Sequence, residues 1–263
     1  MIGLFLGEKD LPYEIIKKIE RKKIKYFIID LTKNNKFKKN KNSFFINIGK
    51  FGEILKLIKS KKCNKVIFAG NIIKPKLSKL KLDIRGLFYI PRIVKASKLG
   101  DAAILKVLIK ILSENKIKVI KLNSFNPELT LKKGVYTKIK PNLLEKDEIE
   151  KGIRILKKIN SYNHTQAVII RDNKVISRET RKGTKEMIKS VSKSKIKKGI
   201  LIKLPKVKQD LRVDLPTIGI DTFKDCNKVG IKGIVVKSNQ NIILNKEVCI
   251  KYANQNKLFL ISI

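Results

Sequence analysis

Short apolar runs alternate with amphipathic stretches over the first 120 residues, and this alternation constrains the fold more than any other feature of the chain. Continuous apolar runs predict buried strands, and apolar residues that recur at helical spacing predict helices. The predicted strands are 2–6, 25–30, 43–48, 65–70 and 116–120, and the predicted helices are 12–21, 51–62 and 102–115. Strands that alternate with helices are typical of a parallel sheet covered by helices, so we expect an α/β fold.

The segment 71–100 interrupts this alternation, because Pro75, Gly86 and Pro91 divide it into short amphipathic pieces. It follows the strand predicted at 65–70. Open α/β sheets usually bind ligands with the loops that follow the carboxyl ends of their strands. We therefore predict ligand-binding loops in this segment.

A second domain is predicted after residues 123–142, which are rich in proline, asparagine and glycine and show little periodicity. Beyond them come a predicted helix at 146–159, a predicted hairpin that turns at 171–173, and further alternating strands and helices. We place the two α/β domains at 1–130 and 131–263.

The chain is strongly basic, with 62 lysines and arginines against 22 acids and a net charge of +40. Such a charge is common in proteins that bind nucleic acid or anionic membranes. The lysines are spread along the whole chain, however, and only 8 of the 62 cations are arginine, the residue best suited to bidentate phosphate contacts. A lysine-rich composition explains the charge at least as well, so no specific nucleic-acid partner is expected.

Several familiar sites are excluded by the sequence. It contains no GxxxxGK[ST], GxGxxG or GxSxG motif, which excludes the usual P-loop, the dinucleotide fingerprint and the esterase nucleophile turn. His164 is the only histidine and no CxxC pair occurs, so a zinc site of cysteine and histidine ligands is not expected. Three widely spaced cysteines favour a reducing compartment, and we expect a cytoplasmic protein.

Asp210 and Asp214 are the most notable acidic pair, because they lie four residues apart around Arg212 in a chain with few acids. If the two carboxylates converge, they could share one Mg²⁺ ion, which prefers oxygen ligands and bridges to phosphates. Nearby basic and hydroxyl side chains could hold phosphate oxygens during phosphoryl transfer. These neighbours are Lys203, Lys206, Lys208 and Thr217. A surface turn whose carboxylates pair with lysines has the same spacing, and that alternative stays open.

Two shorter clusters lie in the N-terminal half. Asp83 and Arg85 fall inside the interrupted segment, and Gly100 and Asp101 precede the helix predicted at 102–115. Asp101 is expected to cap that helix, whose first backbone amides could instead bind an anion.

A third cluster lies in the C-terminal half, where Gly183 and Thr184 begin a predicted helix close to Glu179. A glycine turn at the start of a helix is suited to phosphate, because backbone amides point out of the helix there. Such turns are common in proteins, so this one is weak evidence for a phosphate site.

Five segments, taken in chain order, resemble the LpxI family, the UDP-2,3-diacylglucosamine pyrophosphatases of lipid A biosynthesis. They are GLFLGEKDLPYEI, FAGNIIKPKLSKLKLDIRG, KLGDAAILKVL, KGTKEMI and KLPKVKQDLRVDLPTIG. The resemblance extends over essentially the whole chain, and QDLRVDLPTIG is its most specific part. It implies two α/β domains, an N-terminal Rossmann-like parallel sheet and a C-terminal α/β domain, with the active site between them.

The resemblance also implies the reaction, a Mg²⁺-dependent hydrolysis of UDP-2,3-diacylglucosamine to UMP and 2,3-diacylglucosamine 1-phosphate. Water is expected to attack the phosphorus next to the sugar. The implied partners are the nucleotide-lipid substrate and the inner face of the inner membrane, where the protein would be peripheral, and a homodimer is one option.

Site residues follow from the same resemblance. Asp210 and Asp214 would be the catalytic and metal-binding pair, with Gln209, Arg212 and Thr217 supporting the phosphates. Four residues would line the N-terminal side of the cleft, namely Asp83, Arg85, Gly100 and Asp101.

The chain departs from the family at two places. Lys182 and Lys185 flank Gly183-Thr184 where the family has Glu-Gly-Thr-Asp, and the first loop, Leu6-Gly7-Glu8-Lys9, lacks the usual run of glycines. If the two missing acids are peripheral in the family, the activity is retained. The alternative is a non-catalytic basic protein that binds nucleic acid or a nucleotide-lipid.

Overall fold

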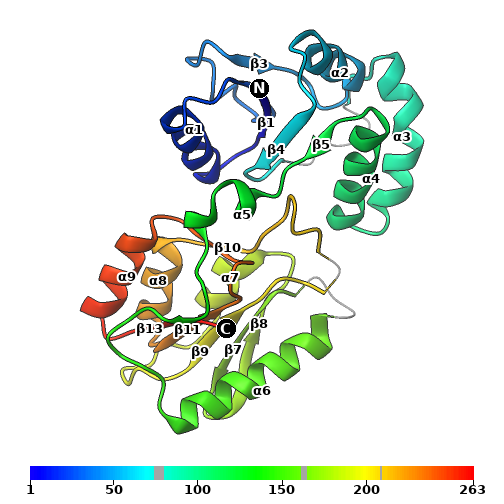
Figure 1. The fold of residues 1–263 in the computed structure, drawn as a ribbon. Coiled ribbons are helices and arrows are strands. Elements are labelled where there is room, and N and C mark those ends of the chain that lie inside the picture. The colour runs from blue at the N-terminus through cyan, green and yellow to red at the C-terminus, as the bar shows by residue number, and fades with distance from the viewer. Residues whose placement is uncertain (74–79, 161–164, 208) are drawn as a thin grey trace. The chain divides into compact units, whose positions relative to one another are not determined.

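The computed structural model describes residues 1–73, 80–160, 165–207 and 209–263, and the chain forms two compact units within them (Figure 1). The N-terminal unit contains Met1–Asn126 together with Arg212–Asp214. The C-terminal unit contains Pro127–Leu211 and Leu215–Ile263. Our predictions for Pro75, His164 and Lys208 fall outside the described residues.

The N-terminal unit is built on a five-stranded parallel sheet with the order β3-β2-β1-β4-β5. Its strands are β1 (Ile2–Leu6), β2 (Tyr26–Asp30), β3 (Ser43–Phe45), β4 (Lys65–Ala69) and β5 (Lys118–Val119). Every residue of β1 is buried, as expected for a central strand with both faces covered. The strand order is that of a doubly wound Rossmann-like sheet, so the predicted fold class is confirmed.

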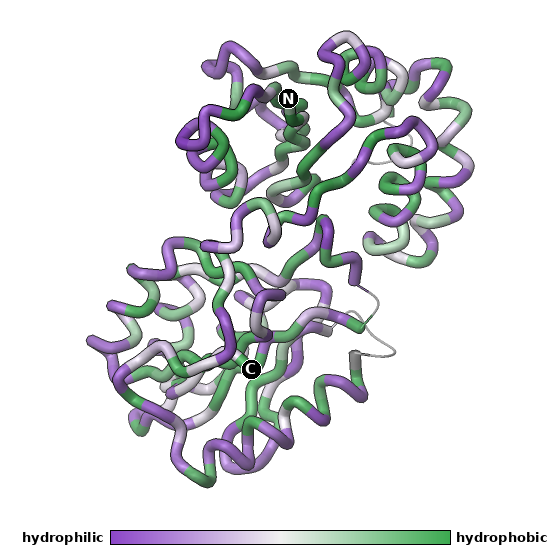
Figure 2. Tube along the Cα trace, in the orientation of Figure 1, coloured by the Kyte–Doolittle hydropathy of each residue, from purple (hydrophilic) through white to green (hydrophobic). Residues whose placement is uncertain are grey.

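Helices accompany this sheet at α1 (Leu11–Arg21), α2 (Phe51–Ser60), α3 (Ile84–Ser97), α4 (Asp101–Glu114) and α5 (Leu122–Phe125). Most of them are amphipathic, as Figure 2 shows by the alternation of hydrophilic and hydrophobic residues along the tube. In α1, for example, Ile15 and Ile19 are completely buried one turn apart, while Lys22 and Lys23 beyond the helix are exposed. The burial of one apolar face holds each such helix on the sheet.

Helix α3 occupies Ile84–Ser97 in the segment 71–100, so the prediction of loops was wrong for that part of the segment. Asp83 starts the helix as its N-cap, because its carboxylate accepts a hydrogen bond of 2.7 Å from the Gly86 amide. Pro91 lies inside the helix and cannot donate a backbone hydrogen bond there. Tertiary packing compensates for this loss, since Tyr89 packs edge-on against Phe51 of α2 with a centroid separation of 5.5 Å.

The C-terminal unit contains a six-stranded sheet with the order β6-β13-β11-β9-β7-β8. Its strands are β6 (Gly134–Val135), β7 (Ala167–Arg171), β8 (Lys174–Arg178), β9 (Ile200–Lys203), β11 (Gly233–Val236) and β13 (Phe259–Ser262). Strands β9, β11 and β13 are parallel, whereas β6, β7 and β8 run antiparallel to their neighbours. A separate parallel pair consists of β10 (Thr217–Ile218) and β12 (Ile242–Ile243).

Helices cover both faces of this sheet. Alternate strand residues point to opposite sides, so the strands contribute to two separate cores. Ile169 and Leu201 pack into a core with three helices, α7 (Gly183–Lys189), α8 (Ile220–Lys228) and α9 (Lys246–Gln255). Val168 and Ile202 pack into the other core, which contains α6 (Leu143–Asn160). Figure 1 shows α6 on the face of the sheet opposite α8 and α9.

The predicted linker at 123–142 is only partly irregular. It contains the end of α5, a 3₁₀ turn at Pro127–Leu129 and strand β6, which pairs with β13 of the C-terminal sheet. Within the described ranges, no helix is long and apolar enough to cross a bilayer.

Candidate active site

The strongest candidate site in the C-terminal unit begins where β9 ends, at Lys203. Strand β9 is central in the sheet and parallel to β11, and the chain leaves its carboxyl end into the QDLRVDLPTIG segment. This is the edge at which open α/β sheets place ligands, because the loops from parallel strands emerge there together. Asn241 supports the strand end by donating a hydrogen bond of 3.1 Å from its buried side chain to the Lys203 carbonyl.

Lys203, Thr184 and Glu179 form a mostly buried hydrogen-bonded network at this strand end. The Lys203 ammonium donates to Thr184 Oγ1 at 2.6 Å, and the Thr184 hydroxyl donates to Glu179 Oε1 at 2.5 Å. The Lys203 Nζ atom lies 4.0 Å from that same carboxylate oxygen. Lys203 is 8% exposed and Glu179 7%, so two opposite charges lie close together in a mostly buried place. The network therefore holds a fixed cation at the edge of the sheet.

Three elements bring this network together. Glu179 directly follows β8 in the β7–β8 hairpin, and its second carboxylate oxygen accepts a hydrogen bond of 2.9 Å from the Gln166 amide. Gly183 begins α7 with φ +86°, a conformation that favours glycine. Thr184 is the next residue, so its hydroxyl is positioned by the first turn of the helix. The predicted turn at Gly183-Thr184 thus lies next to the predicted Lys203.

Gln209 places a further donor close to β9. It is 9% exposed, and its Oε1 atom accepts a hydrogen bond of 2.8 Å from the Lys206 amide. The Nε2 atom of Gln209 is buried without a hydrogen-bond partner among the described residues. The side-chain oxygen Oε1 of Gln166 is buried in the same way, whereas the backbone carbonyl of Gln166 accepts a hydrogen bond from the Leu204 amide. Buried amide groups normally have partners, so this Gln209 donor is available to an acceptor such as a water molecule or a phosphate oxygen.

Asp210 and Asp214 belong to different units. Asp210 lies in the C-terminal unit, whereas Asp214 belongs to the N-terminal unit with Arg212 and Val213. Val213 packs against the N-terminal hydrophobic core, which explains this assignment. Both aspartates are partly exposed. The prediction that the two carboxylates share one cation stays a prediction.

The donor chemistry of this pair fits Mg²⁺, which commonly takes one or two carboxylates and completes its shell with water and substrate phosphates. No group of three or more histidine, cysteine or acidic side chains is arranged to hold a metal ion in the described part of the chain. Thr217, the first residue of β10, donates its hydroxyl to the Leu215 carbonyl at 3.1 Å.

In the N-terminal unit, Asp83 is occupied by backbone contacts. Its carboxylate accepts hydrogen bonds from the amides of Gly86, Gly52 and Glu53 at 2.7, 3.1 and 2.9 Å, and so joins the starts of α3 and α2. Burial raises the pKa of Asp83, but these three bonds outweigh burial, and the pKa lies below its ordinary value. Asp83 is thus a brace between two helices, and Arg85 beside it is exposed.

Gly100 and Asp101 differ in part from the prediction. The N-cap of α4 is Gly100, with φ +101°, whereas Asp101 is the first residue of the helix. The Ala103 amide donates to the Gly100 carbonyl at 3.1 Å, so it is not available to an anion. Asp101 is exposed and lies where a carboxylate interacts favourably with the helix dipole.

The loop after β1 is closed by the chain's own backbone. Glu8 and Asn71 form an antiparallel bridge, and a Cβ atom on Gly7 would lie 2.5 Å from the Asn71 carbonyl oxygen. Glu8 also forms an ion pair of 2.5 Å with Lys36. These contacts hold the loop after β1 against the chain that follows β4.

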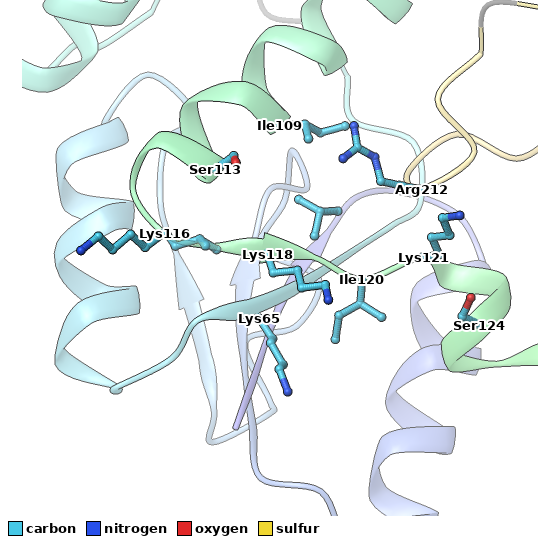
Figure 3. A pocket seen from close by; sticks show the side chains of 11 residues that line it. Lys65, Ile109, Ser113, Lys116, Lys118, Ile120, Lys121, Ser124 and Arg212 are labelled. Atoms are coloured by element: carbon cyan, nitrogen blue, oxygen red, sulfur yellow. The ribbon is translucent and has the colours of Figure 1, made fainter.

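A cavity of about 670 Å³ lies along the edge strand β5 of the N-terminal unit (Figure 3). It is lined by Ile109, Ser113, Ile117, Val119, Ile120, Ser124 and the five cations Lys65, Lys116, Lys118, Lys121 and Arg212, with no acid among its described lining residues. Lys65 and Lys118 are the first residues of β4 and β5, so the cavity begins at the amino ends of these strands. Of the predicted site residues, Arg212 alone lines it.

Sequence reasoning missed Gln166 and Asn241, which support the network at β9. Neither residue belongs to a recognisable motif, and both reach the site only through the pairing of distant strands and loops. The lysines of the cavity were missed as well, because lysine is abundant everywhere in this chain.

Two family models together match nearly the whole chain. The model of the LpxI N-terminal domain matches residues 1–129, and the model of the LpxI C-terminal domain matches residues 132–261. A curated relative from Caulobacter vibrioides, the UDP-2,3-diacylglucosamine pyrophosphatase LpxI, is 29% identical over 226 residues. That alignment covers 83% of this chain and 81% of the relative.

Proposed function

Because the chain belongs to the LpxI family, we propose that it is a hydrolase that cleaves the pyrophosphate of UDP-2,3-diacylglucosamine in lipid A biosynthesis. The relative from Caulobacter vibrioides is named for this activity, and its similarity extends over most of both chains. In the proposed reaction, water adds to the phosphorus next to the sugar, and the bond from that phosphorus to the bridging oxygen breaks. UMP leaves with the bridging oxygen, and 2,3-diacylglucosamine 1-phosphate is the second product.

The observation that carries this proposal is the network at the end of β9. Lys203 offers a buried positive charge held by Thr184 and Glu179, and Gln209 offers a buried amide donor in the segment that follows. Positioned donors of this kind stabilise phosphate oxygens whose negative charge increases during phosphoryl transfer, and they need no reorganisation during the reaction. The arrangement thus supports a phosphate group of the substrate at this edge of the sheet.

Asp210 and Asp214 are the proposed acidic pair. A carboxylate in this position can accept a proton from the attacking water or fix the water by a hydrogen bond. The two carboxylates are also the proposed ligands of Mg²⁺, which supplies charge neutralisation at the phosphate oxygens when it is bound. Arg212 lies between the two aspartates in the sequence and adds a cation that suits bidentate contact with phosphate.

We place the reaction at the cytoplasmic surface of the membrane. Two acyl chains hold the proposed substrate in a bilayer, so the protein acts there as a peripheral enzyme. A strongly basic chain is attracted to anionic lipids, since each lysine near the surface contributes about 1 kcal/mol.

Product analysis in ¹⁸O-labelled water tests the proposed reaction. The purified protein is incubated with UDP-2,3-diacylglucosamine and Mg²⁺, and both products are examined by mass spectrometry. We expect UMP without label and 2,3-diacylglucosamine 1-phosphate with one ¹⁸O atom. Label in UMP would contradict attack at the phosphorus next to the sugar, and absence of both products would contradict the proposed hydrolase.

A further inference from the structure

Helix α3 presents an apolar stripe to solvent. Ile84 is 87% exposed, Leu87 58% and Phe88 74%, and Pro91 is exposed as well. These positions are separated by three, four and seven residues, the spacing that places side chains on one face of a helix. Contiguous exposed apolar patches on soluble proteins commonly mark an interaction surface.

The stripe faces away from the N-terminal unit, because the opposite face of α3 is fixed by side-chain contacts. Tyr89 is buried against Phe51 of α2, and it accepts a hydrogen bond of 3.2 Å from Asn115. Arg92 forms a bidentate ion pair with Glu114 of α4, with distances of 2.8 and 2.9 Å. The helix therefore cannot turn its stripe inward without breaking these contacts.

The charged residues of α3 itself are all positive. From Ile84 to Gly100 the sequence contains no acid, and Arg85, Lys95 and Lys98 are exposed. Leu99, just beyond the helix, is 76% exposed and adds to the apolar surface. A helix with an exposed apolar face and flanking cations is suited to an anionic bilayer surface, because its apolar residues enter the acyl boundary while the cations contact lipid phosphates.

We propose that α3 is a membrane-docking helix, whose stripe of Ile84, Leu87 and Phe88 inserts into the surface of an anionic bilayer. Charge complementarity selects this occupant: Arg85, Lys95 and Lys98 match anionic headgroups. The long lysine side chains can also extend along an apolar surface while their ammonium groups stay in water. This docking is independent of the proposed hydrolysis, because it requires no substrate.

Another helix of the chain provides a matched control. Leu143 and Leu144 at the start of α6 are 77% and 72% exposed, as much as the α3 stripe. Four acids lie in the first eight residues of that helix, and two of them, Asp147 and Glu150, are exposed. An anionic bilayer should repel this acidic surface, so substitutions at Leu143 and Leu144 remove a similar apolar area without removing the docking helix.

The first experiment is co-sedimentation with vesicles at physiological ionic strength and without substrate. The vesicles consist of phosphatidylcholine with phosphatidylglycerol, or of phosphatidylcholine alone. We expect L143S/L144S to bind the anionic vesicles like wild type, and I84S/F88S to bind them at least about tenfold more weakly. Equal binding of I84S/F88S and wild type would overturn the proposal, and so would equal losses in the two double variants.

The second experiment uses the absence of tryptophan from the chain. Phe88→Trp introduces a single fluorophore into the stripe, and Leu144→Trp introduces one into the control helix. We expect anionic vesicles to shift the emission of F88W to the blue and brominated lipids to quench it, with no change for L144W. An unshifted F88W spectrum would overturn the proposal. A blue shift of the F88W emission that appears without vesicles when the protein concentration is raised would also overturn it, because a second copy of the chain would then cover the stripe.

Discussion

The ammonium group of Lys203 donates a hydrogen bond of 2.6 Å to the hydroxyl of Thr184. The same hydroxyl donates to the buried carboxylate of Glu179, so Thr184 connects a cation at the end of β9 with an anion at the end of β8. This connection helps to fix the position of the cation, because movement of either long side chain would break a buried hydrogen bond. The proposed phosphate contact depends on this fixed position.

Removal of the Thr184 hydroxyl should therefore impair turnover. Thr184→Val keeps the shape of the side chain but breaks the connection between Lys203 and Glu179, and we expect kcat/KM for UMP release to fall about tenfold or more. Thr184→Ser retains the hydroxyl and is the matched control, with activity close to wild type. Steady-state kinetics of both variants provide the measurement, and equal activity of T184V and wild type would contradict the assignment.

The two lysines beside this threonine should matter little for catalysis. Lys182 and Lys185 are exposed at the start of α7, where a positive charge opposes the helix dipole. We expect K182E/K185D to raise the stability of the protein by about 0.5–2 kcal/mol, the sum of two such charge reversals.

The kinetic part of this prediction is separate. We expect K182E/K185D to keep kcat/KM for UMP release within about threefold of wild type, because no substrate contact is assigned to either lysine. Thermal denaturation and steady-state kinetics of the same preparation measure both effects. An increase in kcat/KM far above threefold would contradict the prediction, because it would show that acids at these positions take part in the reaction.

Asp83 should stabilise the junction of α2 and α3 rather than bind substrate. Asp83→Ala removes three backbone hydrogen bonds, and we expect a loss of about 1–2 kcal/mol in the free energy of unfolding. Asp83→Asn keeps one acceptor oxygen and should lose less. Urea denaturation of the three proteins provides the comparison, and an unchanged stability of D83A would contradict the bracing role.

The effect of Asp83 should also depend on pH. Hydrogen bonds to the carboxylate hold its pKa in the folded protein below the ordinary value of 3.8. Its contribution to stability is therefore complete at pH values above the pKa of the unfolded chain. The contribution is lost as the pH falls through the lower native pKa. Urea midpoints measured from neutral to acidic pH should therefore converge for wild type and D83A, and a constant difference would contradict this linkage.

Cys226 and Cys249 should be inert in the folded protein. Burial raises the pKa of the Cys249 thiol to about 12 and raises that of Cys226 even further. Neither thiol forms an appreciable amount of thiolate at pH 8, and the thiolate is the reactive species. We expect iodoacetamide to label both residues only after unfolding in urea, as measured by mass spectrometry of peptides. Rapid labelling of the folded protein would contradict their burial.

Much of the fold follows from local sequence patterns, because buried parallel strands need continuous apolar runs and β1 and β2 have them. Helix α3 did not follow, since its apolar residues lie on both its inner and its outer face and Pro91 interrupts its backbone hydrogen bonds. No simple helical period results from such a distribution. The structure stabilises this helix through Asp83 and Tyr89, whose contacts join segments distant in the sequence.

The candidate site shows the same limit. Thr184 was predicted from a glycine turn and Lys203 as a basic neighbour of Asp210 and Asp214, but the hydrogen bond between Thr184 and Lys203 depends on the packing of α7 against the sheet. Gln166 and Gln209 owe their unsatisfied amide atoms to burial, which sequence patterns do not reveal for isolated polar residues.

The most direct test of the proposed hydrolase is the rate of UMP release from UDP-2,3-diacylglucosamine by the purified protein, compared with that of D210N/D214N. The double variant keeps the size of both side chains and removes their negative charge. We predict Mg²⁺-dependent turnover by the wild-type protein and a loss of at least about a thousandfold in the folded double variant. A wild-type rate no higher than that of D210N/D214N would contradict the account.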